Sequence, residues 1–320
     1  MQKSEWDTYW NEIINSNKLN KTIEMLDQID EEKNRLKRTK DICKNIFDNY
    51  QAIESSLKEV EEKTIILLKD IDNIYLQSSR VKTVDSLIVK VINRRYKYIN
   101  SKKSRYNQID DDNYVDIITD LVGIRLIIAH MGDWKDIHEQ LMIIFPMNKD
   151  YQYNDDDLIE RNEAAMQALL PHAYYLDGEK EIEDMYVENG ITAKLSNEGY
   201  RSIHYTVTFQ NYYIEIQLRP LFMEQWCMCS HNYVYKKEAN SNHVFLENMS
   251  RTLENMTDMS GEIGDLMKAV YEGEYYVKAN GNAFLMNENG IKCVDKLIEM
   301  CNNSMKELQT LKNRIELEEK

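Results

Sequence analysis

The hydrophobic residues of this chain change their spacing twice, and this change constrains the fold more than any other feature of the sequence. From about residue 20 to residue 70 they recur every three or four positions between Lys and Glu residues, which predicts amphipathic helices. The recurring positions are Ile42, Ile46, Tyr50, Ile53, Leu57 and Val60. The same spacing returns between residues 245 and 315, so we expect a long helical extension at each end.

The middle of the chain has the periodicity of strands. Residues 123–129 are almost entirely apolar and predict a buried strand, whereas residues 204–209 and 212–218 alternate around Gln210 and Asn211, which predicts a hairpin. The acidic, Tyr-rich residues 150–196 predict helix and loop, and residues 274–282 predict a short hairpin or a loop. We therefore expect an α+β fold with a mixed sheet of about five strands between helices.

The C-terminal extension carries an apolar stripe that is rich in methionine. Its members are Phe245, Met249, Leu253, Met256, Ile263, Leu266, Val270, Val294, Leu297, Cys301, Met305, Leu308, Leu311 and Ile315. Because Met fills irregular cores, we expect this stripe to be core. The alternative is a contact surface between subunits of a homo-oligomer.

Charge and cysteine content exclude several classes of protein. The formal net charge of −15 argues against non-specific coating of nucleic acid, because the phosphate backbone would be repelled on average. The 5 Cys residues form no CxxC pair, which favours reduced thiols over a disulfide framework or a structural zinc site. Since the sequence shows no apolar signal segment and no run of about 18 apolar residues, we expect a soluble cytoplasmic protein without membrane contact.

The second strand of the predicted hairpin has one polar face. Ile214, Ile216 and Leu218 alternate with Glu215, Gln217 and Arg219. Three polar side chains on such a strand face either solvent or a functional site, and the strand alone favours solvent.

Five segments, this strand among them, together favour a functional site over solvent. They are residues 80–87, residues 119–125, residues 199–204, residues 215–219, and Trp226 followed by His231 and Tyr235-Lys236. In this order and register they resemble the synthetase domain of the RelA/SpoT family, in particular its small alarmone synthetases, over roughly residues 75–237. The resemblance implies a nucleotidyltransferase-like core at residues 73–240, between helical extensions at residues 1–72 and 241–320.

The resemblance also implies a reaction: transfer of the β,γ-pyrophosphate of ATP to the ribose 3′-hydroxyl of GDP or GTP, with Mg²⁺ bound and AMP released. Arg80, Lys82 and Ser86 match the family's phosphate-binding loop, where cations and donors hold anionic oxygens. Arg125 would reach the donor phosphates or the adenine. Taken alone, the first three residues are equally typical of surface charges at the start of a helix.

Two acidic residues match the metal and base positions of the family. Asp120 corresponds to the magnesium-binding aspartate, although an aspartate at such a junction also serves as a cap or turn residue. Glu215 corresponds to the glutamate that faces the metal and takes the proton of the attacking hydroxyl.

The acceptor site is expected around the segment 199–204. Tyr200 matches the residue that stacks on guanine, and His204 would contact a phosphate, with Lys194, Gln217 and Arg219 as further acceptor-binding residues. His231 would orient the core. The spacer between Lys194 and Gly199 is longer than in the alarmone-producing pattern, so the acceptor identity stays open.

Two alternatives to a guanine nucleotide synthetase remain. Toxic relatives transfer pyrophosphate to the 3′ end of tRNA, and a basic segment could receive a tRNA backbone, although a solvated helix face and the ATP loop explain it as well. Its members are Arg80, Lys82, Lys90, Arg94, Arg95, Lys97, Lys102, Lys103 and Arg105. The other alternative is an inactive binding module. The toxin alternative includes an antitoxin partner. Long members of the resembled family carry a hydrolase domain with a His-Asp pair, and this sequence has no His-Asp dipeptide, so hydrolysis of the product is not expected.

Overall fold

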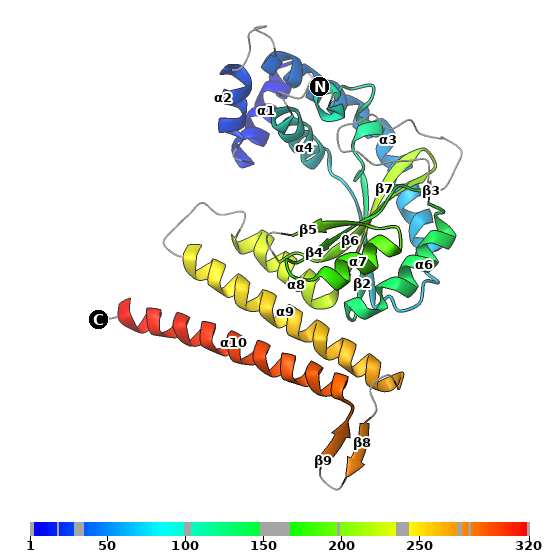
Figure 1. The fold of residues 1–320 in the computed structure, drawn as a ribbon. Coiled ribbons are helices and arrows are strands. Elements are labelled where there is room, and N and C mark those ends of the chain that lie inside the picture. The colour runs from blue at the N-terminus through cyan, green and yellow to red at the C-terminus, as the bar shows by residue number, and fades with distance from the viewer. Residues whose placement is uncertain are drawn as a thin grey trace.

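A central mixed sheet with helices on both sides organises the computed structural model of the chain (Figure 1). The structure describes residues 3–17, 19–28, 35–98, 104–147, 167–196, 199–234, 243–273, 277–280 and 283–318. The expected α+β class is confirmed. Within the described ranges no helix is long and apolar enough to cross a membrane.

The sheet has seven strands rather than about five. They are β1 (Leu76–Val81), β2 (Val122–Ile128), β3 (Gln167–Ala168), β4 (His172–Tyr175), β5 (Thr192–Leu195), β6 (Ser202–Phe209) and β7 (Tyr212–Pro220). The order is β1-β2-β7-β6-β4-β5, with β3 on β6. The pairs β2–β7 and β4–β5 are parallel, and the others are antiparallel.

The predicted hairpin is the pair β6–β7, and its turn explains why the chain reverses there. Gln210 and Asn211 have φ angles of 49° and 68°, the left-handed geometry that matches the twist of the flanking strands. The additional strands β3, β4 and β5 lie in the segment where helix and loop were expected. They are only two to four residues long, which is too short to display a period in the sequence. The expected helix is present as α7 (Lys180–Glu188), and residues 150–166 of that segment lie outside the described residues.

The N-terminal helices share the core of the sheet. They are α1 (Lys3–Ser16), α2 (Asn20–Gln28) and α3 (Arg35–Leu68). The predicted stripe of α3 is buried at Ile42, Ile46, Tyr50, Leu57 and Val60, in one cluster with strand residues of β2, β6 and β7. The expected N-terminal helical extension is therefore packed against the sheet and completes its core.

Short helical elements connect the strands. They are α4 (Val84–Lys97), the 3₁₀ turn η1 (Arg105–Gln108), α5 (Tyr114–Ile117), the 3₁₀ turn η2 (Met131–Asp133), α6 (Trp134–Ile144), α7 (Lys180–Glu188), α8 (Leu221–Cys229) and the π-helical η3 (Ser230–Val234). Thr83 caps α4, because its Oγ1 accepts from the backbone N–H of Ser86 at 3.3 Å.

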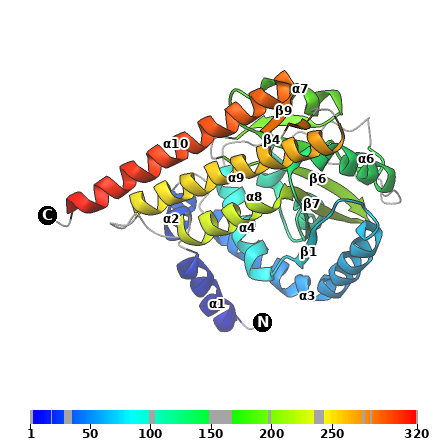
Figure 2. The same ribbon diagram turned by 90° about the horizontal axis from the view of Figure 1, so that it is seen from below.

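Two long antiparallel helices form the C-terminal part, α9 (His243–Tyr271) and α10 (Glu288–Glu318). A two-stranded hairpin of β8 (Val277–Asn280) and β9 (Ala283–Met286) joins them, so a hairpin follows where a hairpin or loop was expected. In Figures 1 and 2, α9 lies between α8 and α10. It is held by Trp226, whose Nε1 donates to the carbonyl of Ser250 at 3.2 Å, and by Lys268, which pairs with Asp133 at 2.9 Å.

The expectation that the methionine-rich stripe is core is wrong for much of its length. Met249, Met256 and Ile263 of α9 and Met305 of α10 are exposed, Met305 at 67%. The reason is that α9 turns a different face to the domain, where Thr252 and Thr257 are buried. The exposed residues are compatible with the alternative, a contact surface between subunits.

Candidate active site

The pairing register places polar side chains from several strands on one face of the sheet. Arg125 of β2 pairs with Gln217 of β7, Gln217 pairs with His204 of β6, and His204 pairs with His172 of β4. Directly paired residues point to the same face, so these four side chains form one row across the sheet. The intervening residues, such as Leu126 and Ile216, are buried in the core on the other face.

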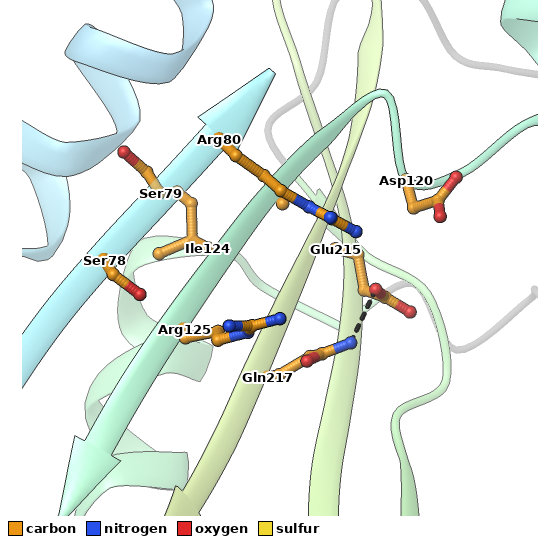
Figure 3. A pocket seen from close by; sticks show the side chains of 9 residues that line it. Ser78, Ser79, Arg80, Asp120, Ile124, Arg125, Glu215 and Gln217 are labelled. Carbon is orange, nitrogen blue, oxygen red and sulfur yellow. Dashed lines mark hydrogen bonds between the residues drawn. The ribbon is translucent and has the colours of Figure 1, made fainter. Parts of the chain in front are cut away.

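A small cleft with a cavity volume of about 60 Å³ opens on this polar face (Figure 3). It is lined by Ser78, Ser79, Arg80, Asp120, Gly123, Ile124, Arg125, Glu215 and Gln217. Gly123 pairs with both Arg80 and Glu215, and a Cβ at this position would lie 3.8 Å from Cγ and Nε of Arg80, in ordinary contact. Residues from three predicted motifs therefore meet in one cavity.

Asp120 lies at the entrance of β2 between two lysines. Its Oδ2 is 3.0 Å from Nζ of Lys82, and its Oδ1 is 2.7 Å from Nζ of Lys90. Burial lowers the pKa of Lys82, and the charge of Asp120 opposes that shift. Lys82 is thus a partner of Asp120 in this structure. Lys90 was not among the expected site residues, although its position four residues after Ser86 on α4 puts it on the same helix face.

Glu215 is an ionised carboxylate held by its neighbours. Its Oε1 is 3.4 Å from Nδ1 of His204, and its Oε2 accepts from Nε2 of Gln217 at 2.8 Å. Burial alone would raise the pKa of Glu215, but the hydrogen bond and charge of His204, the charge of Lys90 and the amide of Gln217 lower it to about 2.

Asp120 and Glu215 fit a magnesium ion. Both line the cleft, and Figure 3 shows their carboxyl groups at the same end of it. Carboxylate oxygen is the ligand that Mg²⁺ prefers, and one or two carboxylates normally suffice with phosphate oxygens and water. The described residues contain no group of three or more His, Cys, Asp or Glu that would form a complete protein cage. The pair therefore suits an ion that arrives with a phosphorylated substrate.

Tyr200 is positioned by two side chains of the polar face. Its Oη lies 2.8 Å from Nε2 of His204 and accepts from Nη2 of Arg219 at 2.9 Å. Burial raises the pKa of Tyr200 to about 12 against the opposing charge of Arg219, so the hydroxyl stays protonated. Gly199 provides the turn before it, with a φ of +75° that a side chain would strain.

Arg219 is buried, and its contacts are with the protein. Besides Tyr200 it donates to Gln217 and, through Nη1, to Oε2 of Glu224 at 2.8 Å. Oε1 of the same Glu224 accepts from Nη1 of Arg125 at 2.9 Å. Glu224 of α8 was not predicted from the sequence. The only available signal was its place one helical turn after the strand that carries Glu215.

Two rings of β4 extend the group formed by Tyr200 and His204 and were also not predicted. His172 lies 5.0 Å from His204 between ring centroids, and Tyr174 lies 5.2 Å from Tyr200. Lys194 of β5 pairs with Tyr174, which brings this predicted residue next to the aromatic group. The β4 residues could not be found in advance because the strand itself was not predicted.

The structure places other predicted residues outside the cleft. The Ser86 hydroxyl accepts from Thr83 Oγ1 at 2.9 Å at the start of α4, and the residue does not line the cavity. His231 is exposed in η3, so the expectation that it orients the core is wrong, whereas Trp226 is buried. Tyr235 and Lys236 lie outside the described residues.

The basic segment does not form a continuous basic surface. Arg105 is 0% exposed, and Arg95 is buried with its Nη1 donating to the carbonyl of Ile109 at 2.6 Å. Lys82 and Lys90 bind Asp120. Several of the nine cations therefore serve the interior, while Lys102 and Lys103 lie outside the described residues.

The polar face gathers two carboxylates and two arginines in one cleft, an arrangement suited to an enzyme that transfers phosphate groups. Residues 79–240 match the family model described as "Region found in RelA / SpoT proteins". The chain belongs to the RelA/SpoT family.

Solved structures of this family are similar to the chain at low identity. The small alarmone synthetase 1 from Bacillus subtilis is 18% identical with a TM-score of 0.45, covering 71% of this chain and 100% of its own. A GTP pyrophosphokinase family protein from Streptococcus pneumoniae is 18% identical with a TM-score of 0.42, covering 71% of this chain and 96% of its own. No curated protein sequence matches the chain.

Proposed function

We propose that the protein transfers the β,γ-pyrophosphate of ATP to the ribose 3′-hydroxyl of GDP or GTP, forming a guanosine tetra- or pentaphosphate and AMP. The observation that carries this proposal is that Asp120 and Glu215, from separate segments, line one cleft together with Arg80 and Arg125. Family membership and this cleft support the same chemistry.

The donor side uses the cations of the cleft. Arg80 and Arg125 hold the phosphate oxygens of ATP with their guanidinium groups, and Lys82 and Lys90 hold the Asp120 carboxylate in place. Mg²⁺, when bound by Asp120 and Glu215, would neutralise charge on the phosphates. Ser86 contributes through the start of α4 and its Thr83 cap.

Glu215 orients the acceptor hydroxyl and takes its proton. The 3′-oxygen bonds to the β-phosphorus of ATP, the bond from that phosphorus to the bridging oxygen of the α-phosphate breaks, and AMP leaves. A carboxylate with a pKa of about 2 is a weak base, but a loose transition state needs little deprotonation before the new bond forms. The proton therefore moves late, when the bonded oxygen has become strongly acidic.

The acceptor side is the ring cluster around Tyr200. Its ring stacks on the guanine, while Arg219 and His204 hold its hydroxyl. Lys194 and Gln217 provide further polar contacts to the acceptor. His204 contacts the phosphates of the acceptor on one side and Glu215 on the other. Arg219 acts on the acceptor mainly through Tyr200.

One experiment tests both the activity and the acceptor. Purified protein with magnesium and radiolabelled ATP is offered GDP, GTP or bulk tRNA in parallel. We expect label on the guanine nucleotide and AMP release that depends on it. Label only on tRNA, with loss of aminoacylation, would replace the proposal by the translation-toxin function, and no transfer at all would favour a binding module.

The structure gives the tRNA acceptor less support than the basic segment alone suggested, because several of its cations are buried or paired. We further propose that the protein works as a soluble, cytoplasmic homo-oligomer. The exposed apolar residues of α9 and α10 supply the surface for contact between subunits.

A further inference from the structure

Glu224 joins the two halves of the site. Each of its carboxylate oxygens accepts from a different arginine: Oε1 from Arg125 at 2.9 Å and Oε2 from Arg219 at 2.8 Å. The two arginines come from the neighbouring parallel strands β2 and β7. The carboxylate is largely buried, and a carboxylate in this position offsets the repulsion between two guanidinium groups.

The two arginines differ in what else they can bind. The Arg125 side chain is 41% exposed and lines the cleft, where Figure 3 shows it extending over the neighbouring strand. The Arg219 side chain is 6% exposed and donates to the hydroxyl of Tyr200. An uninterrupted chain of contacts therefore runs from Arg125 through Glu224 and Arg219 to Tyr200.

We propose that Glu224 is a positioning residue that couples binding of the donor nucleotide to binding of the acceptor nucleotide, an inference that rests on the proposed function. A phosphate bound to Arg125 restricts the motion of its guanidinium group. Because Glu224 is hydrogen-bonded to both arginines, the motion of Arg219 and of the Tyr200 ring is then restricted as well. The acceptor then binds to a Tyr200 ring that is already ordered, so its binding costs less conformational entropy and is tighter when the donor is bound.

Titration calorimetry tests this coupling. The dissociation constant of GDP is measured with and without a saturating, non-hydrolysable ATP analogue in the presence of magnesium. We expect the analogue to tighten GDP binding by about fivefold or more in the intact protein. In Glu224→Gln the amide replaces one accepting oxygen with a donor, so only one arginine keeps its partner. We expect the ratio of the GDP dissociation constants without and with the analogue to fall to less than about twofold in this variant.

A second variant breaks the same chain at another contact. Tyr200→Phe keeps the ring for stacking but removes the hydroxyl to which Arg219 donates, and we expect the same loss of coupling with retained GDP binding. If Glu224→Gln does not fold, Tyr200→Phe alone tests whether this chain of contacts carries the coupling. Glu299→Gln removes an exposed carboxylate of α10 and should keep the ratio of the intact protein.

Several outcomes would overturn the inference. An intact protein that binds both nucleotides independently has no coupling to transmit. Folded variants that keep the ratio would show that the coupling takes another route. Binding of GDP without binding of the ATP analogue, or of neither nucleotide, would overturn the proposed function and the inference with it.

Discussion

Glu215 shows how the neighbours of one residue determine its protonation and hence its role. It sits on an antiparallel hairpin strand whose apolar residues are in the core, so the side chain is presented to the polar face. Burial opposes its charge, yet His204, Lys90 and Gln217 together keep it ionised. The proposed roles of Glu215 toward the metal and the acceptor hydroxyl both need this ionised form, which the neighbours maintain throughout the neutral pH range.

Replacement of this carboxylate should be costly for the reaction. We expect Glu215→Gln to lower kcat by about a hundredfold or more, which is the usual effect of losing a general base. The assay is AMP release with GDP or GTP as acceptor. Glu139→Gln on α6, which changes the same functional group outside the cleft, should leave the rate unchanged. Comparable rates for intact protein and Glu215→Gln would contradict the assignment.

The depressed pKa of Glu215 also predicts a pH-dependent stability. A carboxyl group whose pKa is about 2 in the folded protein and about 4.3 when unfolded stabilises the fold above pH 4.5, and this contribution disappears as the pH falls toward 2. The free energy of unfolding should therefore differ most between intact protein and Glu215→Gln at neutral pH. Urea unfolding from pH 7 down to pH 3 should show the difference shrinking. A constant difference over that range would argue against the ion pairs described here.

Among the elements, α9 bears most directly on the segment around Tyr200. Arg201, next to Tyr200, donates both to Glu179 and to Asp258 of α9. Glu254 of the same helix lies against Gly199, where an added Cβ would clash with its carboxylate. The helix thus covers the segment that carries Tyr200.

Loss of Arg201 should destabilise the protein more than loss of its partner on α9. Arg201→Gln leaves Glu179 and Asp258 buried without a cation, at a cost of about 3 kcal/mol. Asp258→Asn leaves Arg201 paired with Glu179 and should cost about 1 kcal/mol. Thermal unfolding measures both. Burial raises the pKa of Asp258 against the opposing charge of Arg201, so the defect of Arg201→Gln should shrink at lower pH. An equal or larger defect in Asp258→Asn would contradict this account.

In the whole molecule, the two terminal parts differ in how they relate to the sheet. The N-terminal helices enter the same hydrophobic cluster as β2, β6 and β7. The C-terminal helices contact α8 and the η2 turn mainly through polar groups and leave apolar residues exposed. An exposed apolar surface of this kind is typical of an interface.

The mass of the protein in solution tests this interface. We expect a multiple of 38.0 kDa for the intact chain and a shift toward the monomer in a variant with Met256→Lys and Met305→Lys, because two buried charges would oppose association. Size-exclusion chromatography with light scattering measures it. Ile143→Lys, on a 79% exposed residue of α6, should not change the mass. A monomeric intact protein would contradict the expectation.

Part of the fold and of the site could be predicted from local sequence patterns. The stripe of α3, the strand β2 and the β6–β7 hairpin follow from spacing and from a two-residue turn, since each depends on residues close in the sequence. The motif residues Arg80, Asp120, Arg125 and Glu215 were also found in advance, because their order along the chain carries the family resemblance.

Only the tertiary structure decided which of these residues meet and what holds them. Lys90, Glu224 and His172 joined the site through pairings between separate elements, and nothing in their local sequence distinguishes them from surface residues. The burial of Arg105 and the exposure of Met267 were decided in the same way. The sequence by itself determines which faces of an element are apolar, but which of those faces is covered depends on the packing of distant segments, a long-range property that no local pattern encodes.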